Sequence, residues 1–337
     1  MTKVAINGFG RIGRAFFKIA FERPELKFVA INDLGDPENL AYLLRYDTVY
    51  GRWGHEVKVS DGFLTVGGKK IKLLSEKDPA ALSWEQMGID VVVESTGVFT
   101  HTKDASKHLK AGAKRVVITA PAKGDAPYTL IGANDDMFKE GLPDITCNAS
   151  CTTNAAVPVA AVMMENPGVV KAMLNTVHGY TATQNLVDGP AKKDVRRGRA
   201  AAQNIVPSTT GAAESVARSL KGMEGIFDGI ALRVPVAVGS IVDFTFLSKR
   251  KTGVKEINDI FKKAARSPRW KGVLAVTEEP LVSSDIIGEP YGSIVDLSMT
   301  RVVGDDLVKV LSWYDNEWGY ASTLVEHVVR VGKLISK

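Results

Sequence analysis

Cys151 is the residue of this sequence with the clearest potential for chemistry. It stands in the run NASCTTN at 148–154, where small polar side chains surround the thiol and an Ala- and Val-rich helical pattern follows. A thiol at a helix N-terminus is favoured as the thiolate, and neighbouring hydroxyls add donors for an anion. The pattern favours a nucleophile, although a buried, unreactive thiol is the alternative that these residues leave open. We interpret the other cysteine, Cys147, as such a buried thiol.

A histidine and two features suited to phosphate follow Cys151 along the chain. His178 ends a predicted strand, where it could act as base and ion-pair partner of Cys151 or be an ordinary hydrogen-bonded histidine. A hydroxyl- and glycine-rich segment at 208–213 opens a helix, a position that suits an anion. Between them lies a basic loop containing Lys192, Lys193, Arg196, Arg197 and Arg199. The loop alone fits a solvated turn, a nucleic-acid patch or a phosphate site, and the flanking features favour phosphate.

A glycine motif near the N-terminus predicts a dinucleotide site. Gly8, Gly10 and Gly13 form G-x-G-x-x-G between a predicted strand and helix, and Asp33 ends the next strand. These glycines permit a tight turn, close approach of the backbone to a pyrophosphate, and close packing of helix on strand. A carboxylate at Asp33 would accept ribose hydroxyls and repel a 2′-phosphate, so the pattern favours NAD over NADP.

The elements that position these residues fall into two groups. Continuous apolar runs at 3–7, 27–32, 90–94 and 115–119 predict strands of a parallel sheet covered on both faces, with a helix at 12–22. Runs with more polar alternation at 170–178, 230–236, 240–247 and 307–314 predict a mainly antiparallel sheet. We place a domain boundary near Cys151 and a final helix at 320–337. Pro158 is expected to bend the helix after Cys151 or to move its start.

Composition narrows the classes of protein that the chain can be. Its 337 residues carry a net charge of +5, with 45% hydrophobic and 24% charged residues, which predicts a packed globular protein. Two cysteines exclude a disulfide framework, favour a reducing compartment, and lead us to expect no metal site. No signal peptide or membrane-spanning run is apparent, and the charge does not resemble a nucleic-acid tail. The expected location is therefore the cytoplasm, with neither membrane nor nucleic acid as primary partner.

The motifs together resemble the glyceraldehyde-3-phosphate dehydrogenase family along the whole chain. The resemblance is carried by VAINGFGRIGR at 4–14, NASCTTN at 148–154, HGYTATQ at 178–184, RRGRAA at 196–201, STTGAA at 208–213, LRVPV at 232–236 and WYDNEWGY at 313–320. It implies an α/β protein with a Rossmann NAD-binding domain at 1–150, completed by the C-terminal helix 318–337, and an α+β catalytic domain at 151–317. It also implies a homotetramer that converts glyceraldehyde 3-phosphate, phosphate and NAD to 1,3-bisphosphoglycerate and NADH through a thioester.

The resemblance also implies roles for individual residues. Cys151 would be the nucleophile and His178 its base. Binding of phosphorylated substrate and inorganic phosphate would fall to Ser150, Thr152, Thr181, Arg197, Thr210, Gly211 and Arg233. The cofactor would be held by Asn7, Gly8, Gly10, Arg11, Ile12, Gly13, Asp33, Lys77, Thr119, Asn316 and Tyr320.

The chain departs from the family pattern at a few positions. Ala155 replaces a second cysteine, Lys77 replaces an arginine common near the adenine, and Ala321-Ser322-Thr323 replaces serine, asparagine and arginine. Two alternatives remain: an erythrose-4-phosphate dehydrogenase, and a non-catalytic binding protein on the same fold. The retained YTATQ and TTGAA favour glyceraldehyde 3-phosphate as the substrate.

Overall fold

The chain forms two compact units. The structure, a computed structural model, describes residues 1–191 and 194–335, so Lys192 and Lys193 of the basic loop and the last two residues of the predicted C-terminal helix lie outside the described residues. The first unit comprises residues 1–129, 135–149 and the segment from Leu324 onward, and the second comprises 130–134 and 150–323. The returning segment of the first unit thus begins within the last helix, whereas the family resemblance implied position 318.

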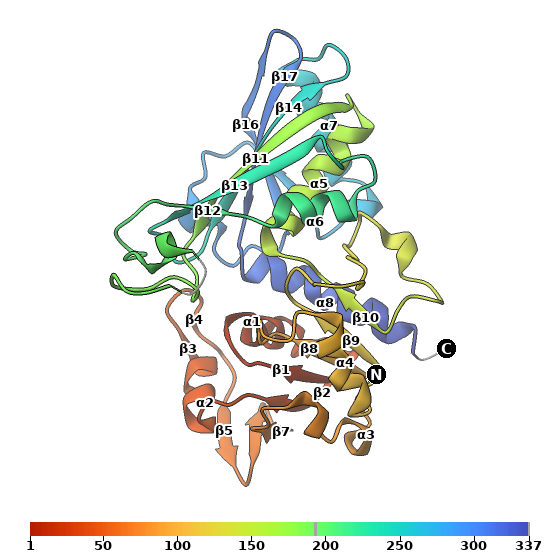
Figure 1. Cartoon of the computed structure of the whole chain (residues 1–337), viewed down its shortest axis with the longest axis vertical. Helices are drawn as coiled ribbons and strands as arrows, with labels where there is room; N and C mark the ends of the chain where they lie inside the picture. The colour runs from red at the N-terminus through yellow and green to blue at the C-terminus, as the bar shows by residue number, and fades with distance from the viewer. Residues whose placement is uncertain (192–193, 336–337) are drawn as a thin grey trace. The chain divides into compact units, whose positions relative to one another are not determined.

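The first unit is built on an eight-stranded sheet in which β1, β2, β8 and β9 lie side by side (Figure 1). The strand order is β10-β9-β8-β1-β2-β7-β6-β5, and every pair from β10 to β7 is parallel. The strands are β1 (Thr2–Asn7), β2 (Leu26–Asn32), β5 (Val57–Ser60), β6 (Phe63–Val66), β7 (Lys69–Leu74), β8 (Val91–Glu94), β9 (Arg115–Ile118) and β10 (Ile145–Cys147). The parallel core confirms the predicted doubly covered sheet, while the antiparallel strands β5 and β6 extend it beyond the prediction.

Helices connect the parallel strands of this unit. They are α1 (Arg11–Ala20), α2 (Pro37–Arg45), α3 (Trp84–Met87) and α4 (Thr102–Lys110), with single turns of 3-10 helix at Pro79–Ala81 and Asp135–Met137 and a small ribbon of β3 (Tyr46–Asp47) and β4 (Gly51–Arg52). The last helix, α8 (Trp318–Lys333), contributes its C-terminal part to this unit. Leu324, Val328 and Val331 are fully buried, so the apolar stripe read from the sequence is part of the core.

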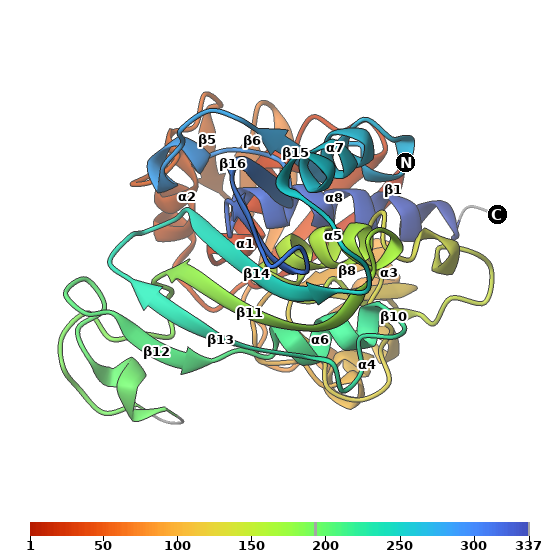
Figure 2. The same ribbon diagram turned by 90° about the horizontal axis from the view of Figure 1, so that it is seen from above.

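The second unit is built on a seven-stranded mixed sheet in the order β12-β13-β11-β14-β17-β16-β15. Figure 2 shows β13, β11 and β14 running side by side. The strands are β11 (Val169–Gly179), β12 (Val206–Thr209), β13 (Phe227–Val234), β14 (Ser240–Ser248), β15 (Leu274–Thr277), β16 (Ser293–Val303) and β17 (Leu307–Tyr314). Four of the six pairs are antiparallel, and β11-β13 and β15-β16 are parallel. The prediction of a mainly antiparallel sheet is confirmed.

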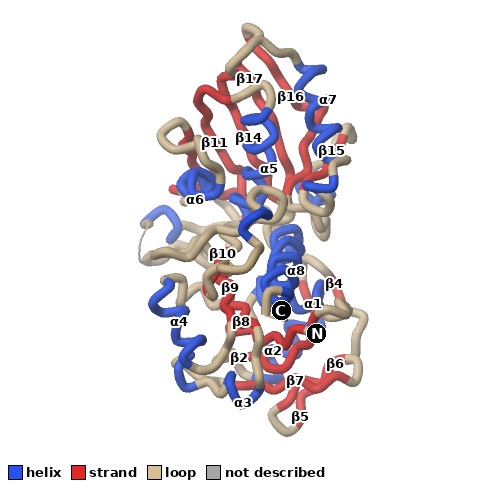
Figure 3. Tube along the Cα trace, turned by 90° about the vertical axis from the view of Figure 1, so that its right-hand side faces the viewer, coloured by secondary structure: helices blue, strands red, loops and turns tan. Residues whose placement is uncertain are grey.

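Side chains alternate between the two faces of this second sheet. On β11 the even positions from Ala172 to His178 are buried, and the odd positions from Met173 to Val177 are partly or fully exposed. The long helix α5 (Cys151–Glu165) contacts β11, β14, β16 and β17. Figure 3 shows α5 and a second helix, α7 (Val254–Ala265), beside the strands. His178 therefore lies on the buried face of this sheet.

Pro158 lies inside α5 and does not move its start, which stays at Cys151. A proline in a helix interior removes one backbone hydrogen bond. The helix continues because Thr152 to Met163 are all buried, so packing on the sheet holds the chain helical where the local sequence opposes it. No helix in the described ranges has the length and apolar character needed to span a membrane.

Candidate active site

The glycine motif forms a turn that only glycine can make at two of its positions. Gly8 has a φ of +93°, and a Cβ there would lie 2.7 Å from the backbone nitrogen of Thr96. A Cβ on Gly13 would lie 2.2 Å from the carbonyl oxygen of Gly8. A Cβ on Gly10 would meet nothing within 4 Å, so this position faces open space at the N-terminus of α1. The turn thus combines tight packing with an approachable helix start, as a pyrophosphate requires.

A cavity of about 760 Å³ opens beside this turn, within the first unit. Its wall includes five of the residues predicted for the cofactor: Asn7, Gly8, Gly10, Asp33 and Lys77. Its volume, its mostly apolar wall and the glycine turn at its edge fit the adenosine and pyrophosphate portion of a dinucleotide. The sequence interpretation missed the other side of the cavity, formed by Ser95, Thr96, Val98 and Phe99 after β8. The sequence did offer a signal for this loop, because it follows the predicted strand at 90–94, whose end lies beside the end of β1 and the glycine turn.

The Asp33 carboxylate is bound to the glycine turn as well as facing the cavity. Its Oδ2 accepts the backbone N–H of Phe9 at 2.6 Å, and its Oδ1 accepts the N–H of Gly35 at 2.8 Å. Each carboxylate oxygen can accept more than one hydrogen bond, so both remain available to ribose hydroxyls. Asp33 therefore holds the turn in shape and keeps a negative charge at the cavity.

The remaining predicted cofactor residues lie outside the wall of that cavity. Arg11 forms a 2.6 Å ion pair with Asp47, and the Thr119 hydroxyl donates to the carbonyl oxygen of Glu94 at 3.1 Å. Asn316, in the second unit, accepts hydrogen bonds from the N–H of Gly239 at 3.3 Å and from a serine hydroxyl at 2.8 Å. Ile12 and Gly13 belong to α1, and Tyr320 is 3% exposed on α8.

Cys151 is the first residue of α5. Ser150 is the N-cap, and its hydroxyl oxygen accepts the N–H of Thr153 at 3.1 Å. Ala149, just before the cap, has a φ of +55°, a left-handed conformation that turns the chain into the helix. The thiol is thus carried by a helix start whose N–H groups face it, which stabilises negative charge on sulfur.

His178 lies in hydrogen-bond contact with this thiol. Its Nε2 lies 3.3 Å from the Sγ of Cys151, and its Nδ1 lies 2.7 Å from the carbonyl oxygen of Gly179. Burial raises the pKa of the Cys151 thiol, an effect that Arg233 opposes. Burial together with the charge of Arg233 lowers the pKa of His178 to about 3. The neutral thiol and neutral imidazole are therefore favoured over the ion pair, and His178 is free to accept a proton.

Two arginines bring positive charge to the same part of the second unit. Arg233, on β13, lies 2.6 Å from the Nδ1 of His178 through Nη1, and its Nε is buried without a hydrogen-bond partner. Arg197 lies in the 3-10 turn Val195–Gly198. Burial lowers the pKa of Arg233, and the positive charge of Arg197 lowers it further. The Nε of Arg197 is also buried without a hydrogen-bond partner. The Nε of Arg197 lies 3.9 Å from a carboxylate oxygen of Asp194. No carboxylate pairs with Arg233 among the described residues, so the two guanidinium groups have the charge and the N–H donors that binding of an external anion requires.

Hydroxyl groups accompany the arginines, but not all are equally accessible. Thr181, Thr210 and Ser150 are partly exposed, and Gly211 is the exposed N-cap of α6 (Ala212–Ser219). Thr152 is only 5% exposed, and its hydroxyl is hydrogen-bonded to that of Tyr314 at 2.9 Å. Of the three hydroxyl residues predicted to meet inorganic phosphate, Thr152 is therefore the least exposed.

Tyr314 is a neighbour of the thiol that the sequence interpretation did not identify. It lies at the end of β17, is 1% exposed, and joins the hydroxyls of Thr152 and Thr176 at 2.9 and 2.8 Å. Its ring meets that of His178 edge to face at 5.9 Å. Burial raises the pKa of Tyr314, so it stays protonated and supports the helix start on one side and the histidine on the other. Within residues 1–191 and 194–335, no cluster of side chains suited to a metal ion is present.

Comparison with known proteins agrees with this arrangement. Two family models match: the NAD binding domain of glyceraldehyde 3-phosphate dehydrogenase over residues 2–102, and its C-terminal domain over residues 150–316. The chain is 48% identical to the glyceraldehyde-3-phosphate dehydrogenase of Streptomyces coelicolor over 331 residues, 98% of each chain. It is 46% identical to that of Neurospora crassa over 338 residues, covering 100% of this chain and 99% of the relative. Identity to the Salmonella typhimurium enzyme is also 46%, over 98% of this chain and 99% of the relative.

Proposed function

Because this chain belongs to the glyceraldehyde-3-phosphate dehydrogenase family, we propose that Cys151 and His178 carry out its chemistry on glyceraldehyde 3-phosphate. The chain is an NAD-dependent dehydrogenase of glycolysis. The observation that carries the assignment of the two residues is the 3.3 Å contact between the Sγ of Cys151 and the Nε2 of His178. A nucleophile and a base in hydrogen-bond reach are what thiol addition to an aldehyde requires.

The first step is addition of the Cys151 sulfur to the aldehyde carbon. The thiol proton passes to His178, whose neutral imidazole is the base, and a new bond joins sulfur to carbon as a hemithioacetal. Backbone N–H groups at the start of α5 stabilise the developing oxyanion, an effect worth roughly 3 kcal/mol in comparable sites. His178 then returns this proton to the oxyanion, which becomes the hydroxyl of the hemithioacetal, and the imidazole is neutral again for the next step.

The second step turns the hemithioacetal into a thioester. His178 accepts the hydroxyl proton while the carbon is oxidised. NAD, when bound beside the glycine turn and Asp33, supplies the acceptor for the two electrons and the hydrogen that leave that carbon. Inorganic phosphate then attacks the thioester carbonyl, the carbon–sulfur bond breaks, and the departing Cys151 sulfur is protonated by His178.

Arg233 and Arg197 hold the phosphate groups during these steps. Their charges have no strong internal partner among the described residues, which supports binding of a dianionic group. Thr181 adds a hydroxyl on the substrate side, and Ser150, Thr210 and Gly211 meet inorganic phosphate. Thr152 joins them once its hydroxyl leaves that of Tyr314. For the cofactor, Arg11 and Ile12 meet the pyrophosphate, Lys77 and Thr119 the adenosine half, and Asn316 with Tyr320 the nicotinamide half.

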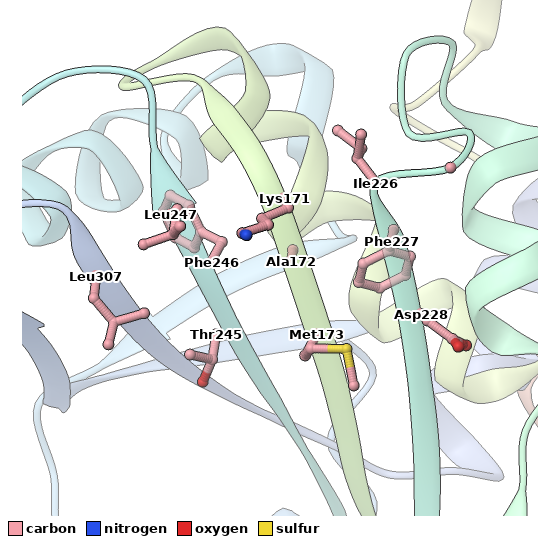
Figure 4. A pocket seen from close by; sticks show the side chains of 11 residues that line it. Lys171, Ala172, Met173, Ile226, Phe227, Asp228, Thr245, Phe246, Leu247 and Leu307 are labelled. Carbon is pink, nitrogen blue, oxygen red and sulfur yellow. The ribbon is translucent and has the colours of Figure 1, made fainter.

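We further propose that the chain works as a homotetramer in the cytoplasm. A hollow of about 680 Å³ lies over the less covered face of the second sheet, where Met173 is 58% and Leu307 is 40% exposed (Figure 4). An exposed apolar face of this size supports packing against another copy. The free thiols of Cys147 and Cys151 support a reducing compartment.

The test follows NADH absorbance with purified protein and two aldehydes. Glyceraldehyde 3-phosphate should be oxidised rapidly only when inorganic phosphate is present, and erythrose 4-phosphate much more slowly. Cys151→Ser should bind NAD normally and lose nearly all turnover, because a hydroxyl is a far weaker nucleophile than a thiol. Substantial turnover by that variant, or a faster reaction with erythrose 4-phosphate, would contradict the proposal.

A further inference from the structure

A buried chain of polar side chains runs behind the cofactor cavity of the first unit. It begins at Trp84 and His108, which are 0% exposed, and continues through Glu94, which is 2% exposed. Asn7, at the end of β1, meets the same carboxylate and belongs to the cavity wall. Of these groups, only Asn7 is among the residues that the family resemblance implies for the cofactor.

Hydrogen-bond polarity along this chain is determined by its first member. The indole N–H of Trp84 can only donate, and it lies 3.0 Å from the Nδ1 of His108. That nitrogen must therefore accept, so the ring proton of the neutral imidazole is on Nε2. Nε2 lies 3.0 Å from Oε2 of Glu94 and donates to it. Trp84 thus selects the tautomer that delivers an N–H to the carboxylate.

Glu94 is surrounded by donors and is consequently a carboxylate. Its Oε2 also accepts the amide of Asn7 at 2.6 Å. Its Oε1 accepts the backbone N–H of Thr96 at 2.9 Å and the Thr96 hydroxyl. No lysine or arginine of the described chain pairs with it. Four donors offset the cost of burying this charge, and an apolar side chain of the same size could hold none of them.

The hydrogen-bonded side chains end at Thr96, which forms part of the cavity wall. The Thr96 hydroxyl donates to Glu94 and accepts the N–H of Val98 at 3.0 Å. Thr96 and Val98 line the cavity, together with Ser95 and Phe99. The loop from Ser95 to Phe99 is therefore attached to the core through Glu94, which accepts hydrogen bonds from His108 on the core side and from Thr96 on the loop side.

We propose that Glu94 and His108 are positioning residues for the cofactor, which hold the loop Ser95–Phe99 in its NAD-binding shape through Thr96. The inference rests on assignment of this cavity to NAD. These hydrogen bonds lead to the cofactor cavity and not to the thiol. Loss of the hydrogen bonds made by Glu94 therefore weakens NAD binding more than it slows chemistry at Cys151.

The test replaces one acceptor oxygen of the carboxylate without changing its size. Glu94→Gln places an amide N–H against a donor, either that of His108 or that of Thr96, and should raise the Kd for NAD measured by calorimetry roughly 10- to 100-fold. In steady-state kinetics the loss should appear in KM for NAD more than in kcat. Ile89→Val, in the buried apolar cluster that contains Trp84, is the matched control and should lower the melting temperature with Kd unchanged.

A double variant separates hydrogen-bond polarity from general stability. Trp84→Phe removes the donor that fixes the tautomer, so His108 can turn Nε2 into an acceptor for the amide of Glu94→Gln. The double variant should therefore bind NAD more tightly than Glu94→Gln alone, although both changes remove stabilising contacts. If Glu94→Gln does not fold, Thr96→Ser should retain NAD affinity and Thr96→Val should lose it.

Two outcomes would overturn the inference. One is a Glu94→Gln protein with a lower melting temperature and the wild-type Kd. The other is a double variant that binds NAD more weakly than either single variant. Asp33→Ala distinguishes failure of the inference from failure of the cavity assignment: if it also leaves the Kd unchanged, NAD does not occupy this cavity. If it raises the Kd while Glu94→Gln does not, the assignment stands and the positioning role is wrong.

Discussion

His327 makes the stability of the first unit depend on pH in a way that can be calculated. It lies on α8, is 0% exposed, and its Nε2 lies within 3.0 Å of the hydroxyls of Thr129 and Thr146. Its Nδ1 is 3.1 Å from the side-chain oxygen of Asn148. Burial, with a smaller contribution from the charge of Arg330, lowers the pKa of His327 from 6.5 to about 3.

Whether stability rises or falls with pH depends on whether the folded or the unfolded protein takes up the proton. Above pH 6.5 the histidine is neutral in both folded and unfolded protein, so it contributes no pH dependence. Between pH 6.5 and about 3 the unfolded chain binds a proton that the folded chain refuses, and the free energy of unfolding falls by roughly 1.4 kcal/mol per pH unit. At pH 4.5 the loss from this one residue is about 3 kcal/mol.

His327→Gln removes this titration while keeping a donor and an acceptor in the site. Near pH 8 the variant should be less stable than wild type by about 1 to 2 kcal/mol, because its hydrogen bonds are less well placed. As the pH falls the difference should shrink and then reverse. His178 titrates in the same direction in both proteins, so its contribution cancels in the comparison.

The assay is urea unfolding of both proteins at intervals from pH 8 to pH 4.5. Val328→Ala, a fully buried neighbour on α8, provides a control that should lose the same stability relative to wild type at every pH. If wild type and His327→Gln lose stability in parallel over the whole range, His327 takes up its proton with the same pKa in the folded and unfolded protein, and the reasoning is wrong.

Three further predictions concern ligands and oxidation. Arg233→Met should lower kcat/KM for glyceraldehyde 3-phosphate roughly 10- to 100-fold more than for unphosphorylated glyceraldehyde, because the lost hydrogen bonds go to the phosphate; equal losses would place Arg233 outside that site. Asp33→Ala should raise the ratio of NADP to NAD use, since repulsion of the 2′-phosphate is removed, and a wild-type protein that already uses both equally would disprove the role. Mild peroxide should convert Cys151 to sulfenic acid or higher oxides without a bond to Cys147, which is 0% exposed and donates to the carbonyl of Ala120. A dominant species two hydrogens lighter in intact mass spectrometry would contradict this.

Features set by local geometry were readable from the sequence. The turn at Gly8 and Gly13 is readable because Gly8 has a φ of +93° and a Cβ on Gly13 would lie 2.2 Å from the carbonyl oxygen of Gly8, so residue types within one short segment report the backbone directly. Cys151 begins a helix because Ser150 caps it, which is again a local relation.

Features that depend on distant segments were not readable in the same way. Tyr314 reaches Thr152 and Thr176 across more than a hundred residues, and although it belongs to the run WYDNEWGY, that run does not indicate a contact with the start of α5. Likewise the pairing of His108 with Glu94 depends on how α4 lies on the sheet. Pro158 does not move the start of α5, for the related reason that burial of the helix overrides a local preference.

The segment order of the two units has a consequence for synthesis on the ribosome. The second unit is almost continuous in sequence, whereas the first needs Leu324, Val328 and their neighbours to close a core begun by residues 1–149. At roughly 5 to 20 residues per second, the ribosome needs on the order of 10 to 35 s to translate the intervening stretch. Throughout that interval the nascent first unit exposes the apolar surface that α8 will cover, whereas the second unit has all its strands as soon as its own segment has been made. Chaperones that act on the growing chain would therefore be expected to bind the earlier-made half for longer than the half made after it.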